Sequence, residues 1–178
     1  TVTNNSNGCT KTDQVDVTSS GTLPNANAGI DKNISCGNPT VTLGGISTAN
    51  VTFSWTGPGI ISGSNTSTPI VNAAGIYTLT VTDIATGCKK TDQVLVTKNT
   101  TLPNANAGLT KELNCSNNTA ILTGSSTSPF TIATWNGAGI TQDTNSFSPT
   151  INKVGTYTLT VTDTVNGCSA TSSVNVTI

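Results

Sequence analysis

Two near-identical stretches dominate this sequence. Residues 75–88 read GIYTLTVTDIATGC and residues 155–168 read GTYTLTVTDTVNGC. The end of the same stretch occurs a third time, because residues 1–18 align with residues 80–97 and 160–177. In both full copies Tyr, Leu and Val alternate with Thr, which is the period of a β-strand with one buried and one solvated face. The sequence therefore predicts a tandem array of similar β modules.

A second repeated segment marks where the modules begin. The sequence TLPNANAG occupies residues 22–29 and again residues 101–108, and its Pro cannot donate to a strand ladder. We therefore expect the C-terminal hairpin of a preceding repeat in residues 1–21 and complete modules in residues 22–100 and 101–178. Each module has six or seven short segments of strand character between turn signals, and none with sustained helical periodicity. This pattern predicts an all-β fold of immunoglobulin-like β-sandwiches arranged head to tail.

The large aromatic residues are candidates for the core of each module. Trp55 and Trp135 fall on the expected third strand, where they would fill the space between two sheets. Tyr77 and Tyr157 begin the expected sixth strand two residues after a Gly, which is the placement of a tyrosine corner. The alternative is a sugar-stacking platform, but one Trp and one Tyr per module favour a core role.

Composition excludes several classes of function. The chain has 7 Lys plus Arg, 8 Asp plus Glu and a net charge of -1, so nucleic acid and anionic membranes are not expected partners. It has no His, and no paired carboxylates stand out, so we expect no enzyme, no catalytic residues and no cofactor. No apolar run approaches the length of a membrane span. The 37 Thr and 21 Asn instead favour strands and turns.

Several motifs together carry a family resemblance. They are ANAGIDKNISCGNPTVTLGG at residues 26–45, FSW at residues 53–55, GIYTLTVTD at residues 75–83, and the Gly-Cys that follows. The chain resembles the PKD-like, immunoglobulin-like repeats of large Bacteroidetes cell-surface proteins, including gliding-motility adhesins. It departs from the PKD type because no WDFGDG-like turn follows the Trp. The resemblance implies a sandwich fold in an extracellular, cell-surface protein.

The five cysteines are placed regularly and predict disulfides. Cys9, Cys88 and Cys168 are equivalent, as are Cys36 and Cys115, and none has the spacing of a metal or redox site. One interpretation pairs Cys36 with Cys88 and Cys115 with Cys168 inside each module. An immunoglobulin-like topology would place those partners at opposite poles, about eight residues of strand or roughly 25 Å apart. A disulfide tolerates Cα separations of only about 4.4 to 6.8 Å.

Stacked modules favour a different pairing. In a head-to-tail array the C-terminal pole of one module faces the N-terminal pole of the next, so Cys36 would meet Cys168. Cys88 would then reach back to a cysteine before residue 1, and Cys115 forward to one beyond residue 178. Such a bond between modules would stiffen the array. The pairing within each module and free thiols remain the alternatives.

Three further features suggest sites. Asp31, Asp83 and Asp163 could contribute to calcium binding at module junctions, although isolated Asp residues more commonly cap turns. By the same resemblance, Asp163-Thr164-Val165 matches the Asp-Ser/Thr-aliphatic pattern of Bacteroidetes O-glycosylation, which makes Thr164 a candidate glycan site. Rows of alternating Thr could suggest an ice-binding face, but any solvated strand of a Thr-rich protein has one.

The sequence therefore favours a structural and adhesive function. We expect a segment of an extracellular bacterial surface fibre or adhesin, whose partners are neighbouring repeats, other fibre chains or surface polysaccharide. The alternative is a spacer or carbohydrate-binding module of a secreted polysaccharide-degrading enzyme. An exposed pair of coplanar aromatic residues would favour the alternative, and the sequence offers no obvious one.

Overall fold

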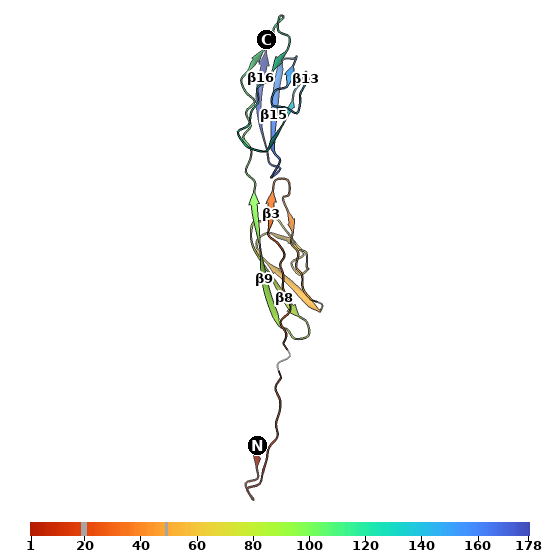
Figure 1. Ribbon diagram of the computed structural model, residues 1–178, viewed down its shortest axis with the longest axis vertical. Helices are drawn as coiled ribbons and strands as arrows, with labels where there is room; N and C mark the ends of the chain where they lie inside the picture. The colour runs from red at the N-terminus through yellow and green to blue at the C-terminus, as the bar shows by residue number, and fades with distance from the viewer. Residues whose placement is uncertain (19–20, 49) are drawn as a thin grey trace.

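The computed structural model describes residues 1–18, 21–48 and 50–178, which form sixteen strands. Figure 1 shows an elongated molecule in which two sandwiches follow one another end to end, with the N-terminus and the C-terminus at opposite ends. Within the described part of the chain, no helix has the length and apolar character needed to cross a bilayer.

The first module contains seven strands in two sheets. The larger sheet has the order β3-β9-β8-β5 and the smaller one the order β4-β7-β6. Their bounds are β3 Lys32–Ser35, β4 Val41–Thr42, β5 Val51–Thr56, β6 Ile60–Ser62, β7 Ile70–Val71, β8 Gly75–Asp83 and β9 Lys89–Asn99. Strand β3 runs parallel to the last strand, β9, and all other pairs are antiparallel. Two packed sheets with this order form an immunoglobulin-like sandwich.

The second module repeats this arrangement strand for strand. Its sheets have the orders β10-β16-β15-β12 and β11-β14-β13, and β10 is parallel to β16. The bounds are β10 Lys111–Glu112, β11 Ala120–Ile121, β12 Thr131–Asn136, β13 Ile140–Gln142, β14 Thr150–Ile151, β15 Gly155–Asp163 and β16 Ser169–Thr177. The fold class is therefore all-β, with two immunoglobulin-like sandwiches in tandem.

The alternation of apolar residues with Thr decides which face of the long strand is buried. Tyr77, Leu79 and Val81 of β8 are fully buried, whereas the intervening Thr side chains lie at the partly solvated face. Trp55 of β5 pairs across the sheet with Leu79 and belongs to the same buried cluster. A slip of one residue in this register would move the whole apolar set to the solvated face, so the pattern also specifies the pairing.

The N-terminal segment differs from the two modules. It contains a short hairpin of β1 Val2–Thr3 and β2 Thr10–Lys11, and all of its described residues up to position 18 are exposed. Val15 and Val17 align with Val94 and Val96, which are buried between the sheets of the first module. The same residues therefore form a core strand where two sheets enclose them, and only a short hairpin with an extended tail where nothing packs against them.

Candidate functional site

A disulfide joins the two modules. Cys36 lies in the loop after β3, Cys168 lies at the turn between β15 and β16, and their Cα atoms are 4.9 Å apart. The bond spans a sequence separation of 132 residues. This is the pairing that head-to-tail stacking favours. The alternative pairs within each module, Cys36 with Cys88 and Cys115 with Cys168, are not formed in this structure.

The turn that carries Cys168 owes its shape to local sequence. Asn166, Gly167 and Cys168, which we call the junction turn, connect two long antiparallel strands. The Cys168 amide donates to the side-chain oxygen of Asn166 at 2.8 Å, and the Gly167 amide donates to the carbonyl of Asp163 at 2.9 Å. Gly167 has a φ of +71°, a left-handed conformation that favours glycine. The turn therefore presents its cysteine in a defined direction.

Hydrogen bonds reinforce the disulfide across the junction. The amide of Gly37 donates to the carbonyl of Asn166 at 3.0 Å. The side-chain amide of Asn166 donates to Asn99 Oδ1 at 3.2 Å and to the carbonyl of Thr101 at 2.9 Å, so it binds the linker between the modules. Asn166 is only 3% exposed. Each such bond contributes about 0.5 to 1.5 kcal/mol, and together they restrict the junction in several directions.

The backbones of the two modules also meet closely here. A Cβ atom placed on Gly167 would lie 2.8 Å from Gly37 Cα and 2.9 Å from Gly37 N. Such distances do not occur between real Cβ atoms and their neighbours, so a side chain at position 167 would push the modules apart. Glycine is therefore required at this turn for contact between modules as well as for its backbone angle.

The other three cysteines are free. Cys9 and Cys115 are exposed, and Cys88 is partly buried. Cys9 lies in the N-terminal hairpin, Cys88 in the turn between β8 and β9, and Cys115 in the loop after β10. Cys88 and Cys115 thus occupy in their own modules the positions that Cys168 and Cys36 occupy at the junction.

The four candidate core aromatics are buried inside the sandwiches. Trp55 and Trp135 are 3% and 2% exposed, and Tyr77 and Tyr157 have no exposed surface. Such burial leaves no aromatic face for stacking on a sugar.

Each tyrosine ties its strand to the preceding loop. The Tyr77 hydroxyl lies within hydrogen-bond distance of the carbonyls of Pro58 and Ala73, the latter at 2.6 Å. Tyr157 makes the same contacts with the carbonyls of Ala138 and Lys153. Burial raises the pKa of both hydroxyls above the ordinary value of 10.0, which keeps them protonated as donors. The arrangement is that of a tyrosine corner.

The candidate calcium ligands serve as structural acceptors. Asp83 Oδ1 accepts hydrogen bonds from the amides of Ala85 and Thr86, and Asp163 Oδ1 accepts them from the amides of Val165 at 2.7 Å and Asn166 at 3.2 Å. Asp31 Oδ1 accepts a bond from the amide of Leu95 at 2.9 Å. The residues that the structure describes contain no group of three or more His, Cys, Asp or Glu placed to hold a metal.

Thr164, the candidate glycan site, lies in the turn after β15. Its side chain is exposed, and its hydroxyl donates to the carbonyl of Phe130 at 2.7 Å. The hydroxyl therefore helps to hold the loop before β12 against this turn.

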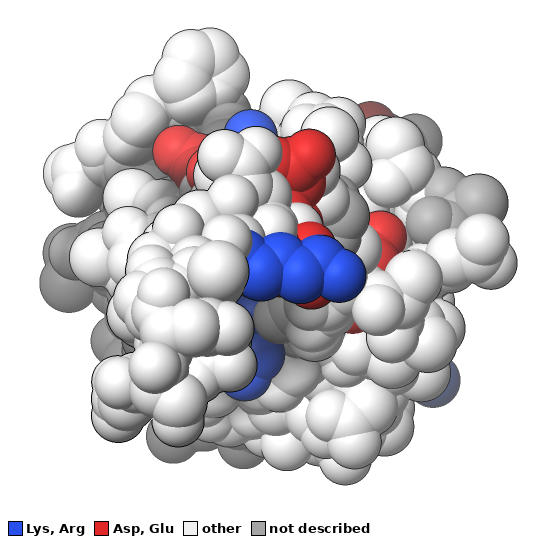
Figure 2. Space-filling view, turned by 90° about the horizontal axis from the view of Figure 1, so that it is seen from below, with Lys and Arg blue, Asp and Glu red and all other residues white. Residues whose placement is uncertain are grey.

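Charge contributes little to these surfaces. Figure 2 shows the molecule from the end that carries the N-terminus, where a few lysine and acidic side chains are intermixed on a mostly uncharged face. This appearance agrees with the net charge of -1. No electrostatic field of one sign is built up on this face to attract an oppositely charged partner.

Sequence reasoning missed the side chain that binds the linker. Asn166 is not among the residues that the sequence pattern singles out, whereas its side-chain amide donates to Asn99 Oδ1 and to the carbonyl of Thr101. The difference between the two modules at this position was a usable signal. The first module has Thr86 there, whose hydroxyl cannot donate two hydrogen bonds, whereas the side-chain amide of Asn166 can. Nothing in the sequence pattern indicated that Asn99 and Gly37 would bond Asn166.

The chain matches no protein-family model, and a search of curated proteins finds no match. Among solved structures it is similar to extracellular domains 3–5 of Drosophila OTK, with 12% identity and a TM-score of 0.39 over 86% of this chain and 61% of that one. It is also similar to an I-band fragment of titin, with 15% identity and a TM-score of 0.40 over 88% of this chain and 66% of that one.

A third similar structure comprises the three N-terminal domains of the highly immunogenic outer capsid protein of bacteriophage RB49. The identity is 17% and the TM-score 0.44, over 86% of this chain and 57% of that one. The chain thus spans less than two thirds of the length of each of these three structures. The fold class rests on the strand order and the buried core, and no function is carried over from these proteins.

Proposed function

We propose that this chain is a structural and adhesive segment of an extracellular bacterial surface fibre, in which disulfides between modules provide stiffness. The observation that carries the proposal is the junction, where a disulfide and two hydrogen bonds join the two sandwiches and a third hydrogen bond holds the start of the second module at the linker. Sandwiches joined only by a linker move relative to one another by default. This junction has more connections than a flexible string of domains requires.

The two covalent connections between the modules, the linker and the disulfide, lie side by side at the end of the first module. The linker continues from the end of β9, and the disulfide begins one residue after the end of β3. These strands run side by side and in parallel, with Ser35 opposite Asn99. The second module is thus held at two neighbouring points, about one strand spacing of 4.8 Å apart. Asn166 bonds Asn99 and Thr101 at the linker and so adds further connections beside these two points.

The chemistry of the junction also supports an extracellular location. Disulfides persist in oxidising compartments and are rare where thiols are kept reduced. The bond closes a long loop, so it constrains the unfolded chain strongly and favours resistance to unfolding. Reach, stiffness and resistance to proteolysis are the properties that a surface fibre needs.

Small-angle X-ray scattering tests the mechanical part of the proposal. The oxidised chain should give the distance distribution of a straight rod, whereas Cys168→Ser should broaden it and shorten the mean end-to-end distance. Cys88→Ser is the matched control, because Cys88 has the equivalent position but no partner. Identical curves for the wild type, Cys168→Ser and Cys88→Ser would show that the disulfide does not stiffen the molecule.

Immunogold electron microscopy tests the cellular part. An antibody raised against residues 22–178 should label threads that project from intact cells of the source organism. Label absent from cells, with the antigen found in the medium bound to polysaccharide, would overturn the fibre proposal in favour of a module attached to a secreted enzyme.

A further inference from the structure

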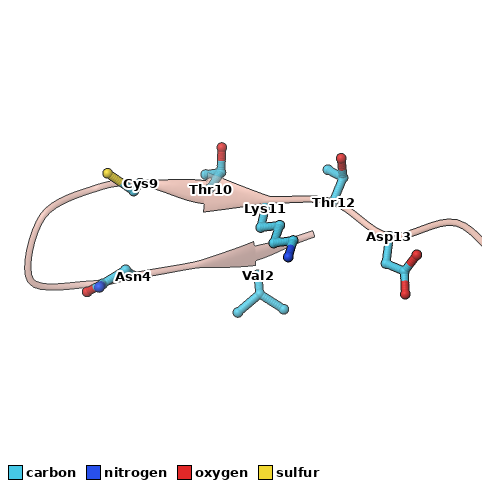
Figure 3. Close-up of a pocket in the computed structure, with 7 residues that line it drawn as sticks. All are labelled: Val2, Asn4, Cys9, Thr10, Lys11, Thr12 and Asp13. Carbon is cyan, nitrogen blue, oxygen red and sulfur yellow. The ribbon is translucent and has the colours of Figure 1, made fainter.

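The hollow beside the N-terminal hairpin lacks the character of a ligand site. It has a volume of about 670 Å³ and is lined by residues of that one hairpin, from Val2 to Asp13. Figure 3 shows Thr10 and Thr12 on one side of the hairpin and Val2 on the other, so the lining groups do not converge on one point. Ligand sites bring a few polar groups together in a concave, mostly apolar surface. This hollow offers no such set of groups.

The second module, in contrast, has an open sheet edge at β12. This strand is last in the order β10-β16-β15-β12 and, among the described strands, pairs with β15 alone. Its six residues, TIATWN, keep a continuous register and include no Lys, Pro or bulge. These are features that commonly protect a sheet edge from further pairing. An edge of this kind can accept another strand.

The hydrogen bonding of Trp135 shows which backbone groups of β12 face outward. Its amide donates to the carbonyl of Thr144 at 2.9 Å, in the loop after β13, so it points away from β15. Because the direction alternates along a strand, the backbone groups of Thr131 and Ala133 point the same way. They have no backbone hydrogen-bond partner on that side among the described residues. Two donors and two acceptors are therefore open to a second strand.

The side chains at this edge are apolar and exposed. Ile132 is 57% exposed, and Phe130, just before the strand, is 73% exposed. The equivalent residues at the edge of the first module are Thr52 and Asn50. Both modules thus have an open edge strand, but in the second module exposed apolar side chains accompany it.

Phe130 has a backbone conformation that its residue type disfavours. Its φ is +53°, in the left-handed region, and the equivalent Asn50, with a φ of +59°, is of a type that tolerates this region. The amide and hydroxyl of Thr164 both donate to the Phe130 carbonyl, at 2.9 and 2.7 Å, and hold it in place. An exposed aromatic side chain in this conformation adds strain without adding to the core. Such residues cluster at binding sites.

A second copy of the chain can pair with this edge about a two-fold axis at Ile132. Thr131 would lie opposite Ala133 of the partner and exchange two hydrogen bonds with it, and the symmetric pair would do the same. Ile132 would face Ile132 of the partner at a non-hydrogen-bonded position, where side chains approach most closely. Phe130 would be diagonal to the partner's Ile132, within the reach of an aromatic ring.

Charge and shape do not oppose this approach. The acidic residue in register with β12 is Asp163, which lies on β15 and accepts hydrogen bonds from the amides of its own turn. The edge strand itself carries no charge, so pairing brings no like charges opposite each other. Adjacent strands of a sheet are rotated by about 20 to 25°. Two rods would therefore diverge on both sides of the paired strands.

We propose that β12 pairs with β12 of a second copy of this chain, antiparallel and centred on Ile132, so that the two larger sheets become one. Figure 1 shows β15 and β16 along the long axis of the molecule, and β12 is antiparallel to β15. The two rods would therefore run in opposite directions, as rods do that project from facing surfaces. This inference rests on the proposed function, since it names the partner of the adhesive segment.

Cross-linking through introduced cysteines tests the register. In a chain whose Cys9, Cys88 and Cys115 are replaced by Ser, Ile132→Cys should form a covalent dimer in a glutathione redox buffer. Its two copies would have Cα atoms about 4.5 Å apart, which suits a disulfide. Thr134→Cys is the matched control on the same exposed face, and its two copies would lie about 13 Å apart, so it should stay monomeric. Equal cross-linking at both positions, or no dimer with Ile132→Cys, would overturn the proposal.

Ile132→Lys tests the contact without cysteine chemistry. It would place two like charges opposite each other at the centre of the pair. Sedimentation velocity should show the dissociation constant of the dimer raised by at least about tenfold. Thr52→Lys, at the equivalent edge of the first module, should leave it unchanged, and thermal unfolding checks that both variants are folded. Equal effects of the two changes, or a wild type that stays monomeric up to about 1 mM, would contradict the pairing.

Beads that carry the chain by its N-terminus test the orientation. Wild-type beads should aggregate, since chains on facing beads run in opposite directions, and Ile132→Lys beads should stay dispersed. Dispersed wild-type beads would overturn the antiparallel arrangement. Straight monomers that retain the Cys36–Cys168 bond but do not pair would reject only this inference. Absence of the antigen from threads on cells bears on the proposed function alone.

Discussion

The two complete modules carry the same turn in two different situations. Thr86-Gly87-Cys88 and Asn166-Gly167-Cys168 both connect the long strands of a sandwich, and Gly87 and Gly167 have φ values of +70° and +71°. Nothing lies within 4 Å of a Cβ atom placed on Gly87, whereas Gly167 meets the backbone of Gly37. The comparison teaches that the local sequence shapes the turn, and that contact with a neighbouring module makes it a joint.

The largest difference in the free energy of unfolding should come from replacing the cysteines of these two turns, Cys168 and Cys88. Cys168→Ser should lower the free energy of unfolding by about 2 to 4 kcal/mol, because it removes a bond that closes a long loop. Cys88→Ser, at the unbonded turn, should change it by less than about 0.5 kcal/mol. Guanidinium unfolding without reductant measures both values, and equal losses would mean that the junction bond contributes nothing of its own.

The second-largest difference in stability should come from replacing the glycines of the two turns, Gly167 and Gly87. Gly167→Ala and Gly87→Ala should each cost about 1 to 2 kcal/mol, because both place a side chain in the left-handed region. Gly167→Ala should cost about 1 to 3 kcal/mol more, because its Cβ atom meets Gly37. Hydrogen exchange of the Gly37 amide gives a second measure, since only the change at position 167 should reduce its protection. The same loss of protection in both variants would contradict the contact.

Replacing the first residue of each turn, Asn166 or Thr86, should give a smaller difference in stability. Asn166→Ala removes two buried donors to the linker and should cost about 1 to 2 kcal/mol. Thr86→Ala removes an exposed hydroxyl that bonds Asp83, so it should cost about 0.5 kcal/mol or less. Urea unfolding of the two variants with the disulfide intact makes the comparison, and a larger loss at position 86 would reverse our assignment.

The smallest predicted effect depends on pH. Hydrogen bonds from the Thr86 amide and hydroxyl lower the pKa of Asp83 below its ordinary value of 3.8, although its carboxylate is exposed. A lowered folded-state pKa means that the contribution of Asp83 is fully present above the unfolded value and is lost as the pH falls through the folded one. NMR titration of the Asp83 carboxyl should give a midpoint below 3.8, and Thr86→Ala should raise that midpoint. An unchanged midpoint in Thr86→Ala would show that the Thr86 hydroxyl does not lower the pKa of Asp83.

Much of each module could be predicted from sequence because its signals are local. The alternation of Tyr77, Leu79 and Val81 with Thr follows from strand geometry, so it specified both the strand and its buried face. The pairing between Cys36 and Cys168 could be favoured because the distance between the poles of a sandwich follows from strand length.

The details of the junction could not be predicted in the same way. The contact of Gly167 with Gly37 and the bonds of Asn166 to the linker depend on how one module is rotated against the next. That rotation is set by the combined packing of residues far apart in the chain. No periodicity or spacing reports it.

By itself, then, the sequence determined the repeat, the strands, the faces that they bury and the shape of each turn, because these follow from contacts between near neighbours and from the two-residue period of a strand. Sequence reasoning favoured the turn of Cys168 as the joint but left other pairings open, and only the tertiary structure decided among them. Cys168 is bonded where Cys88, in the equivalent turn of the first module, is free. The reason is physical: burial and bonding need a second surface at the right place, and local sequence cannot supply one.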